Sequence, residues 1–506
     1  MPPAEILYAE NLALKSEREA LQGTILDLKR QLEWLRRQLF GPGKGEKLDR
    51  LQLLLKLQGV EAELAAKAAA PKQEVSYERR VPKPEKRAAP AELYAKLPVA
   101  ETVVIEPDEV KAEPEAFEQI GEERTFEVAI TPPQLTKREI VRPKYKAKAD
   151  RARPPVLAPA PARVVPGGHA SAGLLAWVCV SKYLDHLPLY RQEQMLGRWG
   201  AAIPRASLCE WIRIAADWLQ PIYRRMHEHL LGGDYLQADE TPIKCHDPDA
   251  GKGAVGQGYL WLVSRPGGDV VFDWKLSRRH GELTGLVAGF AGVLQADGYE
   301  AYDAHAAKSP EVKRVGCWAH ARRKFAEAQG EDPKTVRVAL KLIARLYRLE
   351  RAWDAADAEA GRTRDALERS RLRAIHFARS LRWLHALAVA LRSRHRPKSG
   401  IGQAAGYLLG QWTSLERHVE HGQTRLDNNL VENAVRPTAV GKKNWLFVGH
   451  PEAGQRSAIL YSIIVSCLRH RVEPLAYLRD VLSRLPSMTN QDDFDPLMPS
   501  RWQPRS

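Results

Sequence analysis

The tetrapeptide Leu-Gln-Ala-Asp occurs twice, at residues 236–239 and 294–297, and each copy closes a short apolar run. Short apolar runs bounded by acidic and turn residues predict β-strands. A strand that ends in a carboxylate presents that acid at the edge of a sheet, where clefts form. The repeat therefore predicts two strands that present Asp239 and Asp297 at a sheet edge. The alternative is that each acid only forms a turn or caps a helix, as acids at strand ends often do.

Other segments place these two strands in an α/β core. The segment GYLWLVSRPGGDVVFDWKLS predicts two strands joined by Pro266-Gly267-Gly268, and RVGCWAHARRKFAEA begins apolar and becomes helical. Strands mixed with helices indicate an α/β fold. A helical block rich in Arg, Leu and Ala follows, and the core pattern resumes at RLDNNLVENAVRPTAVGKKNWLFVG. We therefore predict a core in two parts, residues 232–330 and 422–485. The helical block between them, residues 331–421, is predicted to be an insertion, and residues 486–506 are predicted to form a short tail.

The N-terminal region, residues 1–68, carries a heptad pattern of apolar residues. The pattern residues are spaced alternately by four and three positions, and they are Leu21, Ile25, Leu28, Leu32, Leu35 and Leu39. This alternation keeps one apolar stripe on a single seam, as in a leucine zipper. It predicts a coiled coil that joins two or more protomers. The alternative is an amphipathic helix that packs on its own chain.

Two further regions separate the heptads from the core. Residues 69–167 are rich in Pro, Ala and Lys and predict a mostly extended linker, with a small β-hairpin unit between 122 and 145. Residues 168–231 predict helices, one ending near Gly200 and the next beginning near Pro204. A helix, a short turn and a helix with arginines nearby suggest helix-turn-helix DNA binding. A plain helical subdomain without DNA contact is the alternative.

The amino-acid composition indicates what kind of partner the protein binds and in which cell compartment it works. The 506 residues carry a formal net charge of +15, which favours contact with a polyanion such as DNA, although a merely basic protein has the same balance. The five cysteines are scattered and odd in number, so no disulfide framework is predicted. No leader pattern and no apolar stretch long enough for a membrane helix is found in the sequence. We therefore expect a cytoplasmic, nucleoid-associated protein without membrane partners.

A third acid completes a candidate metal site. Glu432 lies in DNNLVENAVRP, which predicts the start of a helix. Hard divalent cations such as Mg²⁺ prefer oxygen ligands and keep open positions for a substrate phosphate. Two such ions held about 4 Å apart by shared carboxylates can activate one oxygen and stabilise the leaving one. Asp239, Asp297 and Glu432 therefore suit phosphodiester cleavage and transfer, if they converge.

The sequence resembles DDE transposases of the insertion sequence 66 family. The segments that carry the resemblance are LQADETPIKC, LQADGYEAYD, CWAHARRKF and DNNLVENAVRPTAVGKKNWLF, in this order. The resemblance implies an RNase H-like catalytic core with a helical insertion before the final Glu. It implies that Asp239, Asp297 and Glu432 form the catalytic, metal-binding triad for two Mg²⁺ or Mn²⁺ ions. It also implies partners: element-end and target DNA, and small accessory proteins of the same element.

One departure from the family concerns a Cys-rich zinc module between the zipper and the helical region. Residues 70–168 contain no Cys, so a Cys-ligated zinc there is excluded by ligand supply. The segment TFEVAITPPQLTKREIVRPKY resembles a degenerate remnant of that module. Any role of the module in DNA binding is therefore not expected to carry over to this chain.

Several other residues have two interpretations each. Six basic side chains near the acids in the sequence are expected to contact DNA phosphate. The alternative is that they only form a solvated helix face. They are Arg322, Arg323, Lys324, Arg436, Lys442 and Lys443. Cys317 and His320 offer too few ligands for zinc, so a packed Cys and a capping or DNA-facing His are expected. Trp445 either stacks on a displaced base or packs in the core. Asp427, Asn428 and Asn429 are expected to cap the helix of Glu432.

These observations predict a multidomain α plus α/β protein: a coiled coil, a helical DNA-binding region and a catalytic core with an insertion. The expected function is metal-dependent cleavage and strand transfer at the ends of an insertion sequence, by a homo-oligomer. One alternative is a nuclease of the same fold that cuts without joining. The other is a non-catalytic DNA-binding dimer or a decayed transposase, although the intact acids argue against decay.

Overall fold

A computed structural model describes residues 135–145, 156–247 and 255–504, together with a few isolated residues between 102 and 148. The chain divides into two compact units, 1–126 and 127–506, and the elements below belong to the second. The heptad region lies outside the described residues, so the coiled coil stays a prediction. Among the described helices, none combines the length and the apolar character needed to cross a membrane.

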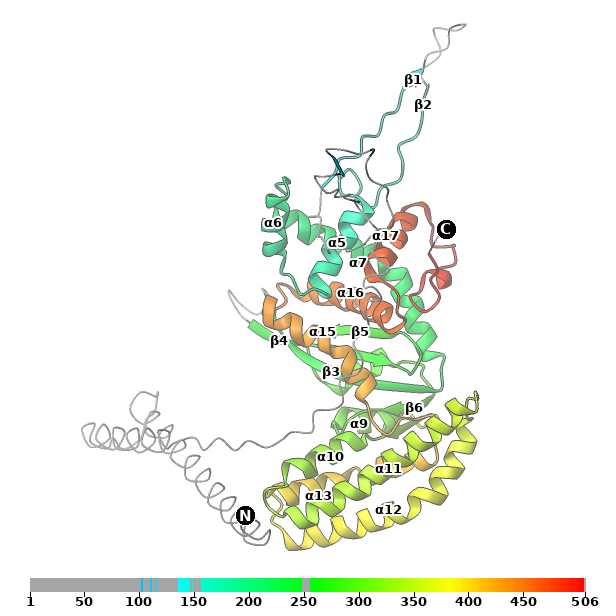
Figure 1. The fold of residues 1–506 in the computed structure, drawn as a ribbon. Coiled ribbons are helices and arrows are strands. Elements are labelled where there is room, and N and C mark those ends of the chain that lie inside the picture. The colour runs from blue at the N-terminus through cyan, green and yellow to red at the C-terminus, as the bar shows by residue number, and fades with distance from the viewer. Residues whose placement is uncertain are drawn as a thin grey trace, which may run out of the picture. The chain divides into compact units, whose positions relative to one another are not determined.

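The described elements alternate between strands and helices through the middle of the chain (Figure 1). The strands are β1 (Lys144–Tyr145), β2 (Val156–Leu157), β3 (Tyr235–His246), β4 (Val255–Ser264), β5 (Val270–Lys275), β6 (Gly292–Gln295) and β7 (Val312–Val315). The helices are α5 (Ala172–Tyr183), α6 (Leu189–Arg198), α7 (Arg205–Leu231), α8 (His280–Leu286), α9 (Glu300–Lys308), α10 (Trp318–Glu327), α11 (Pro333–Glu359), α12 (Ala366–Arg394), α13 (Gly400–Gly410), α14 (Trp412–Glu416), α15 (Asn429–Trp445), α16 (Pro451–Arg469) and α17 (Pro474–Arg484). Short 3-10 turns are η3 (Arg417–Val419), η4 (Leu485–Ser487) and η5 (Asp495–Leu497).

A five-stranded mixed sheet in the order β5-β4-β3-β6-β7 forms the centre of the fold. Strands β3, β4 and β5 are antiparallel neighbours, whereas β6 pairs in parallel with both β3 and β7. The hairpin predicted around Pro266-Gly267-Gly268 is the β4–β5 connection, so that prediction is confirmed. The broader prediction of an α plus α/β fold is confirmed at this level, as a mixed sheet combined with helices.

The prediction that Asp239 ends its strand is wrong. Strand β3 runs seven residues further, to His246, because Asp239 and the residues after it pair with β4 as far as His246↔Val255. On its other side, β3 pairs with β6 only as far as Gln237. Asp239 therefore lies where the parallel neighbour ends, and it is still free of a strand partner on that side.

The edge strand β5 is covered by helix α16. The backbone N–H groups of Val270 and Phe272 donate to the side-chain oxygens of Ser466 and Ser462, at 2.9 and 2.8 Å. The two serines are four residues apart on a helix and the two amides two residues apart on a strand, which are similar distances of about 6 to 7 Å. The serines therefore satisfy an edge that would otherwise be open to pairing with another chain.

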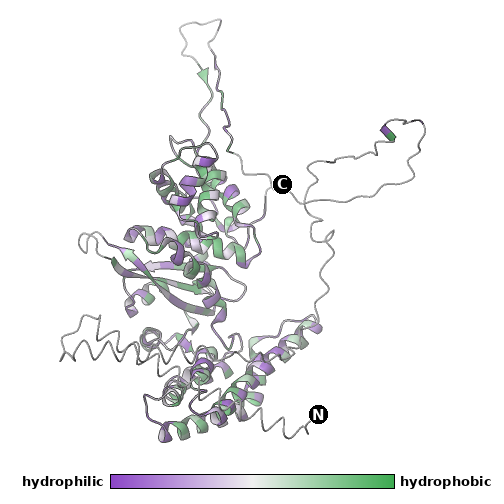
Figure 2. Cartoon of the chain, turned by 60° about the vertical axis from the view of Figure 1, so that its left-hand side comes forward, coloured by the Kyte–Doolittle hydropathy of each residue, from purple (hydrophilic) through white to green (hydrophobic). Residues whose placement is uncertain are grey.

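The helices fall into two packed groups. Helices α5, α7, α16 and α17 contact one another and share the apolar core of the sheet. Helices α10 to α13 pack around a separate apolar cluster that includes Ile343, Leu384 and Leu408. Hydrophilic and hydrophobic residues alternate along these helices, as expected for amphipathic helices that bury one face (Figure 2). We call α11 to α14 with η3, residues 333–419, the helical block.

Helices α6 and α7 occupy the region predicted to hold a helix-turn-helix. Helix α6 ends at Arg198 and α7 begins after Pro204, close to the predicted ends. A DNA-binding role for them stays a prediction. The hairpin predicted within 122–145 is described only from residue 135, and there Lys144 and Tyr145 pair with Val156 and Leu157 further along the chain.

A fully buried arginine ties the helical block to the chain segment that leads back to the sheet. Arg373 on α12 forms an ion pair with Glu350 of α11, with 2.8 Å between Nε and Oε1. Its Nη1 and Nη2 donate to the backbone oxygens of His418, His421 and Thr424 at 2.7 to 3.0 Å. One side chain therefore fixes the course of residues 418–424.

Candidate active site

The two Leu-Gln-Ala-Asp segments lie side by side in the sheet. Strands β3 and β6 are parallel, and their register pairs Leu236 with Leu294 and Gln237 with Gln295. Both leucines are fully buried. The sequence repeat is therefore a spatial repeat in which like residues are neighbours. Asp239 and Asp297 each follow two positions after the paired glutamines, so the register carries both acids toward the same place.

The paired glutamines connect the sheet to the segment before α15. The Nε2 of Gln237 donates to Oε1 of Gln295 at 2.9 Å and to the backbone oxygen of Asp427 at 3.0 Å. The Nε2 of Gln295 donates to the backbone oxygens of Gly316 at 3.0 Å and Arg425 at 2.8 Å. Both side chains are fully buried. The glutamines thus hold the segment that brings Glu432 to the sheet.

We expect Gln295→Leu to destabilise the fold, because the backbone oxygen of Arg425 loses its donor and that of Gly316 keeps only its contact with His418 Nε2. An unpaired buried group costs about 1–3 kcal/mol, and we expect a loss in this range. The midpoint of urea unfolding, followed by circular dichroism, checks this expectation. Gln403→Leu is the matched control, since Gln403 is exposed and donates only to the backbone oxygen of Lys398. A Gln295→Leu protein as stable as this control would contradict the role.

Two of the three acids predicted from the sequence, Asp297 and Glu432, act on the third, Asp239. The pKa of the Asp239 carboxyl is raised to about 8, first by burial, then by the negative charge of Glu240, and further by the charges of Asp297 and Glu432. The backbone N–H of Glu240 donates to Asp239 Oδ1 at 2.9 Å and opposes this shift. Asp297 and Glu432 therefore lie near enough to Asp239 for their charges to act on it, and the catalytic role of the three acids stays a prediction.

The raised pKa of Asp239 predicts a pH-dependent stability. An unfolded Asp titrates near 3.9. Between about pH 4 and pH 8 the folded protein keeps a proton that the unfolded chain has released, so the free energy of unfolding falls as the pH rises through this window. We expect Asp239→Asn to match the wild type near pH 4 and to be more stable by a few kcal/mol above pH 8. Urea unfolding with chelator at both pH values tests this, and a difference that does not grow with pH would contradict it.

Asp297 is positioned by a buried arginine that the sequence pattern did not reveal. Arg314 on β7 is 1% exposed and donates a hydrogen bond to the backbone oxygen of Asp297. Its Nε lies 2.9 Å from a carboxylate oxygen of Asp303. Burial lowers the pKa of Arg314, and the charge of Asp303 partly offsets this effect. Tyr299 N donates to Asp297 Oδ1 at 3.0 Å, so both backbone and side chain of Asp297 are held.

Glu432 lies in the first turn of α15 and faces two basic side chains of α10. Its Oε1 is 3.7 Å from His320 Nδ1, and its Oε2 is 3.7 Å from an Nη of Arg323. Oε1 of Glu432 and Nδ1 of His320 are buried atoms that lack a hydrogen-bond partner within the described part of the chain. The start of α15 is fastened beside Asp239, because Asn428 Nδ2 donates to the backbone oxygen of Ala238 at 2.9 Å.

This contact corrects one predicted cap and leaves another in place. Asn428 occupies the N-cap position of α15 but makes no side-chain capping bond, because its amide is used on Ala238. Asp427 does accept from the backbone N–H of Asn429, at 3.2 Å. The capping prediction is therefore wrong for Asn428 and confirmed for Asp427.

Cys317, His320 and Glu432 each offer one possible ligand atom within 4.8 Å of the others. The sequence pair Cys317–His320 thus gains a third neighbour that only the fold supplies. Burial raises the pKa of the Cys317 thiol to about 12, and Sγ accepts a hydrogen bond from Asn428 N at 3.3 Å. Because the thiolate is the form that binds metal, this environment favours the packed-cysteine interpretation. His320 lies against Glu432.

The six predicted DNA-contacting cations lie on α10 and α15. Arg436 and Lys443 are exposed, and they follow Glu432 by four and eleven residues, which places all three on one face of α15. Lys442 Nζ donates to the backbone oxygen of Pro242 at 3.2 Å. On α10, Arg322 and Arg323 are exposed, and Lys324 lies 4.0 Å from Glu327. Their contact with DNA stays a prediction.

Trp445, at the end of α15, has two predicted roles, and the structure distinguishes between them. Trp445 is partly buried against the core of the sheet, which supports the core interpretation.

Glu240 points to the opposite face of β3 from Asp239 because side chains alternate along a strand. It accepts from Tyr302 Oη at 2.5 Å and from Arg278 Nε at 2.9 Å. Glu240 is not among the residues predicted from the sequence, although it directly follows Asp239.

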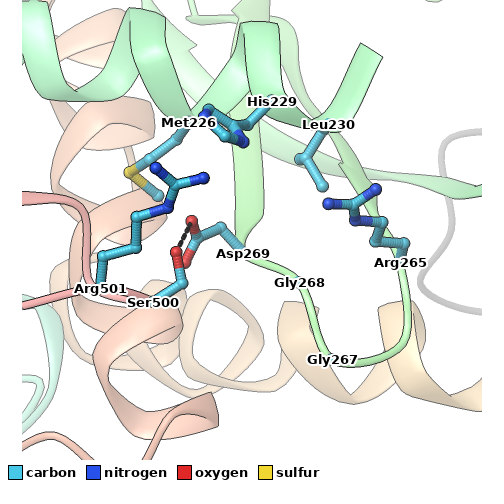
Figure 3. Close-up of a pocket in the computed structure, with 9 residues that line it drawn as sticks. All are labelled: Met226, His229, Leu230, Arg265, Gly267, Gly268, Asp269, Ser500 and Arg501. Atoms are coloured by element: carbon cyan, nitrogen blue, oxygen red, sulfur yellow. Dashed lines mark hydrogen bonds between the residues drawn. The ribbon is translucent and has the colours of Figure 1, made fainter. Parts of the chain in front are cut away.

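A small hollow of about 200 Å³ lies beside the turn of the β4–β5 hairpin (Figure 3). It is bounded by the end of α7, by the turn at Gly267 and by the C-terminal segment, where Ser500 Oγ donates to Asp269 Oδ2 at 2.9 Å. None of the three acids lines it. Glu432 is instead partly exposed to solvent. An open site of this kind suits a polymeric substrate better than a closed pocket would.

Comparison with known proteins gives two family matches and several relatives. The model of the Transposase IS66 family matches residues 167–456, and that of the IS66 C-terminal element matches residues 462–500. The uncharacterized proteins y4jD and y4qI of Sinorhizobium fredii are each 31% identical to this chain, over 77% and 79% of it and over 77% and 75% of their own lengths. The uncharacterized protein y4hP of the same organism is 28% identical over 95% of this chain and 89% of its own.

Proposed function

The chain belongs to the IS66 family of transposases, and we propose that it cleaves DNA at the ends of an insertion sequence and joins those ends to target DNA with divalent metal ions. The observation that carries this proposal is that Asp297 and Glu432 lie near enough to the buried Asp239 carboxyl for their charges to raise its pKa. We further propose that the core is RNase H-like. The strand order β5-β4-β3-β6-β7, with two antiparallel pairs followed by two parallel pairs, supports this assignment.

The donor set fits Mg²⁺ or Mn²⁺. Asp239, Asp297 and Glu432 offer only carboxylate oxygens, which are the ligands that these hard ions prefer. Burial and, after it, the charges of neighbouring acids raise the pKa of Asp239, and a bound cation would oppose this shift by stabilising the carboxylate. Oε1 of Glu432 is buried and without a hydrogen-bond partner among the described residues, so this oxygen is available as a metal ligand. Two bound ions would activate the attacking oxygen and stabilise the leaving one.

The chain's own residues position the reacting groups. Asp239 and Asp297 are carried by adjacent strands whose register is fixed by Gln237 and Gln295, so their separation is set by the sheet. Arg436 and Lys443, on the exposed face of α15 that also bears Glu432, would hold the DNA phosphates beside the acids. No covalent protein–DNA intermediate is needed in this scheme, so no Ser or Tyr nucleophile is assigned.

Both element ends have to be held together for joining. We propose that the heptad region in residues 1–68 makes the homo-oligomer that does this, so that each protomer contributes one site. The accessory proteins of the element are proposed as further partners.

Incubation of the purified chain with end-labelled DNA from its own insertion sequence tests the function. We expect strand cleavage with Mg²⁺ or Mn²⁺, and none with chelator. Pre-cut ends with a free 3′-hydroxyl and a supercoiled target plasmid then test joining. Joined products would support the transposase, and cleavage without joining would indicate a nuclease. DNA binding without any metal-dependent product would overturn the proposal in favour of a non-catalytic DNA-binding protein.

A further inference from the structure

Helix α11 carries a row of cations on its solvent side. Its first seventeen residues, PKTVRVALKLIARLYRL, contain five cations and no acid. The five are all exposed, and they are Lys334, Arg337, Lys341, Arg345 and Arg348. Their spacing of three, four, four and three residues places them on one face of the helix, opposite the buried Val336, Ala339, Ile343 and Leu346. We call these five residues the α11 stripe, and it extends for about 21 Å along the axis.

The stripe has no acidic partners among the described residues, in contrast to the rest of α11. Three of the four acids of α11, which are Glu350, Asp354 and Asp357, form ion pairs with arginines of α12 or of the segment before it. The fourth, Glu359, is the last residue of the helix. Within the described part of the chain, no ion pair involves any residue of the stripe. Three acids of α11 are thus used inside the helical block, and the positive charge of the outer face remains uncompensated.

This separation of charge is unusual for a face that only meets water. Like charges three or four residues apart destabilise a helix, whereas solvated helices commonly mix the two signs. In the helical block and its flanks, residues 331–421, Lys and Arg number 18 and Asp and Glu number 10. A polyanion that lies along the stripe would relieve the repulsion among its five cations.

The stripe belongs to a helix that borders the candidate active site. Helix α10, which bears Arg323 next to Glu432, packs against α11. The pKa of Tyr347 on α11 is raised by burial and also by the negative charge of Asp427, while the charge of Arg322 lowers it. Asp427 precedes α15, so the middle of α11 lies close to the segment that leads to Glu432.

We propose that the α11 stripe binds the phosphate backbone of duplex DNA and so extends the DNA path from the acids onto the helical block. This inference rests on the proposed function for the identity of the polyanion. Arginine and lysine contacts to phosphate fix the position of a duplex without reading its sequence. The contribution is therefore sequence-independent, and each neutralised phosphate releases counterions and makes binding more sensitive to salt.

A triple variant of the full chain, K341Q/R345Q/R348Q, tests the proposal. Affinity for a fluorescent duplex is measured by anisotropy, with chelator present, from 50 to 200 mM salt. We expect the slope of log affinity against log salt to fall in magnitude by about 2 to 3, since each phosphate contact contributes about 0.9. Affinity at the lower salt concentrations should fall by on the order of 10- to 100-fold.

The matched control is R371Q/R379Q/R382Q on α12, which removes the same charge from the same helical block. These arginines are exposed, but Arg382 shares a hollow of about 720 Å³ with the acids Glu416 and Glu420. We expect the control to bind within about threefold of the wild type, because these arginines lie outside the proposed DNA path. Equal losses in both variants, or an unchanged slope in K341Q/R345Q/R348Q, would overturn the proposal.

The binding assay separates this inference from the proposed function. It needs neither metal nor cleavage, so a wild type that never cuts DNA can still show the contribution of the stripe. Circular dichroism and thermal unfolding verify that both triple variants fold. Because the substitutions remove like-charge neighbours, we expect the K341Q/R345Q/R348Q protein to unfold at the wild-type temperature or slightly above it.

Discussion

Asp239→Asn is expected to reduce the rate of DNA cleavage by at least about 10³-fold, on the order of what is lost when a group that stabilises transition-state charge is removed. Asparagine keeps the size of the side chain but lacks the charge that would hold a cation. The fold should tolerate the change, because Asp239 is already driven toward its neutral form by burial and neighbouring acids. Single-turnover cleavage of element-end DNA with Mg²⁺ measures the effect.

DNA affinity separates a catalytic role for Asp239 from a structural one. Measured with chelator, the affinity of the Asp239→Asn protein for element ends should equal that of the wild type, because without metal the Asp239 carboxyl is already driven toward its neutral form. Asp297→Asn and Glu432→Gln should behave alike. Asp185→Asn is the control, since Asp185 is an exposed acid in the loop after α5. Cleavage by any of the three site variants at the control's rate would refute the assignment.

Arg373→Met is expected to cause the largest loss of stability, about 3–5 kcal/mol, because one partner of a buried ion pair is removed. Glu350 would keep only Arg369 as a partner. The backbone oxygens of His418 and Thr424 would lose the donor Arg373, whereas that of His421 would keep its bonds from Thr424. Urea unfolding measures the change in the transition of the helical block.

The same substitution should also impair cleavage. Residues 418–424 lead directly into the segment held by Gln295 and Gln237, and from there into α15 and Glu432. Arg382→Met is the matched control, an exposed arginine of the same helix, and it should change stability by less than about 0.5 kcal/mol. An Arg373→Met protein as stable as this control would show that the buried network does not hold the block to the sheet.

The strands were predictable where the sequence pattern is local. The apolar runs before Asp239 and Asp297, and the turn at Pro266-Gly267-Gly268, indicated β3, β6 and the β4–β5 hairpin. The end of β3 was not predictable, because it depends on pairing with β4 and not on the run itself. Residues such as Thr241 and Pro242 look like a turn until the partner strand is known.

The three acids of the candidate site could be predicted from the sequence. The buried residues that position them could not. Resemblance and strand ends pointed to Asp239, Asp297 and Glu432, and the fold brings them together. Arg314 and Arg373 could not be found from the sequence, because a buried arginine is defined by distant partners and no local pattern marks it. The role of the two glutamines likewise depends on parallel register, which the repeat alone does not specify.

Binding of Mn²⁺ to the chain on element-end DNA tests the central claim most directly. Loss of the electron paramagnetic resonance signal of free Mn²⁺ counts the bound ions. We predict two more ions per chain for the wild type than for a protein in which Asp239, Asp297 and Glu432 are replaced together by Asn, Asn and Gln. Equal binding by the two proteins, with both folded and both on DNA, would contradict the claim that these three carboxylates hold the metal.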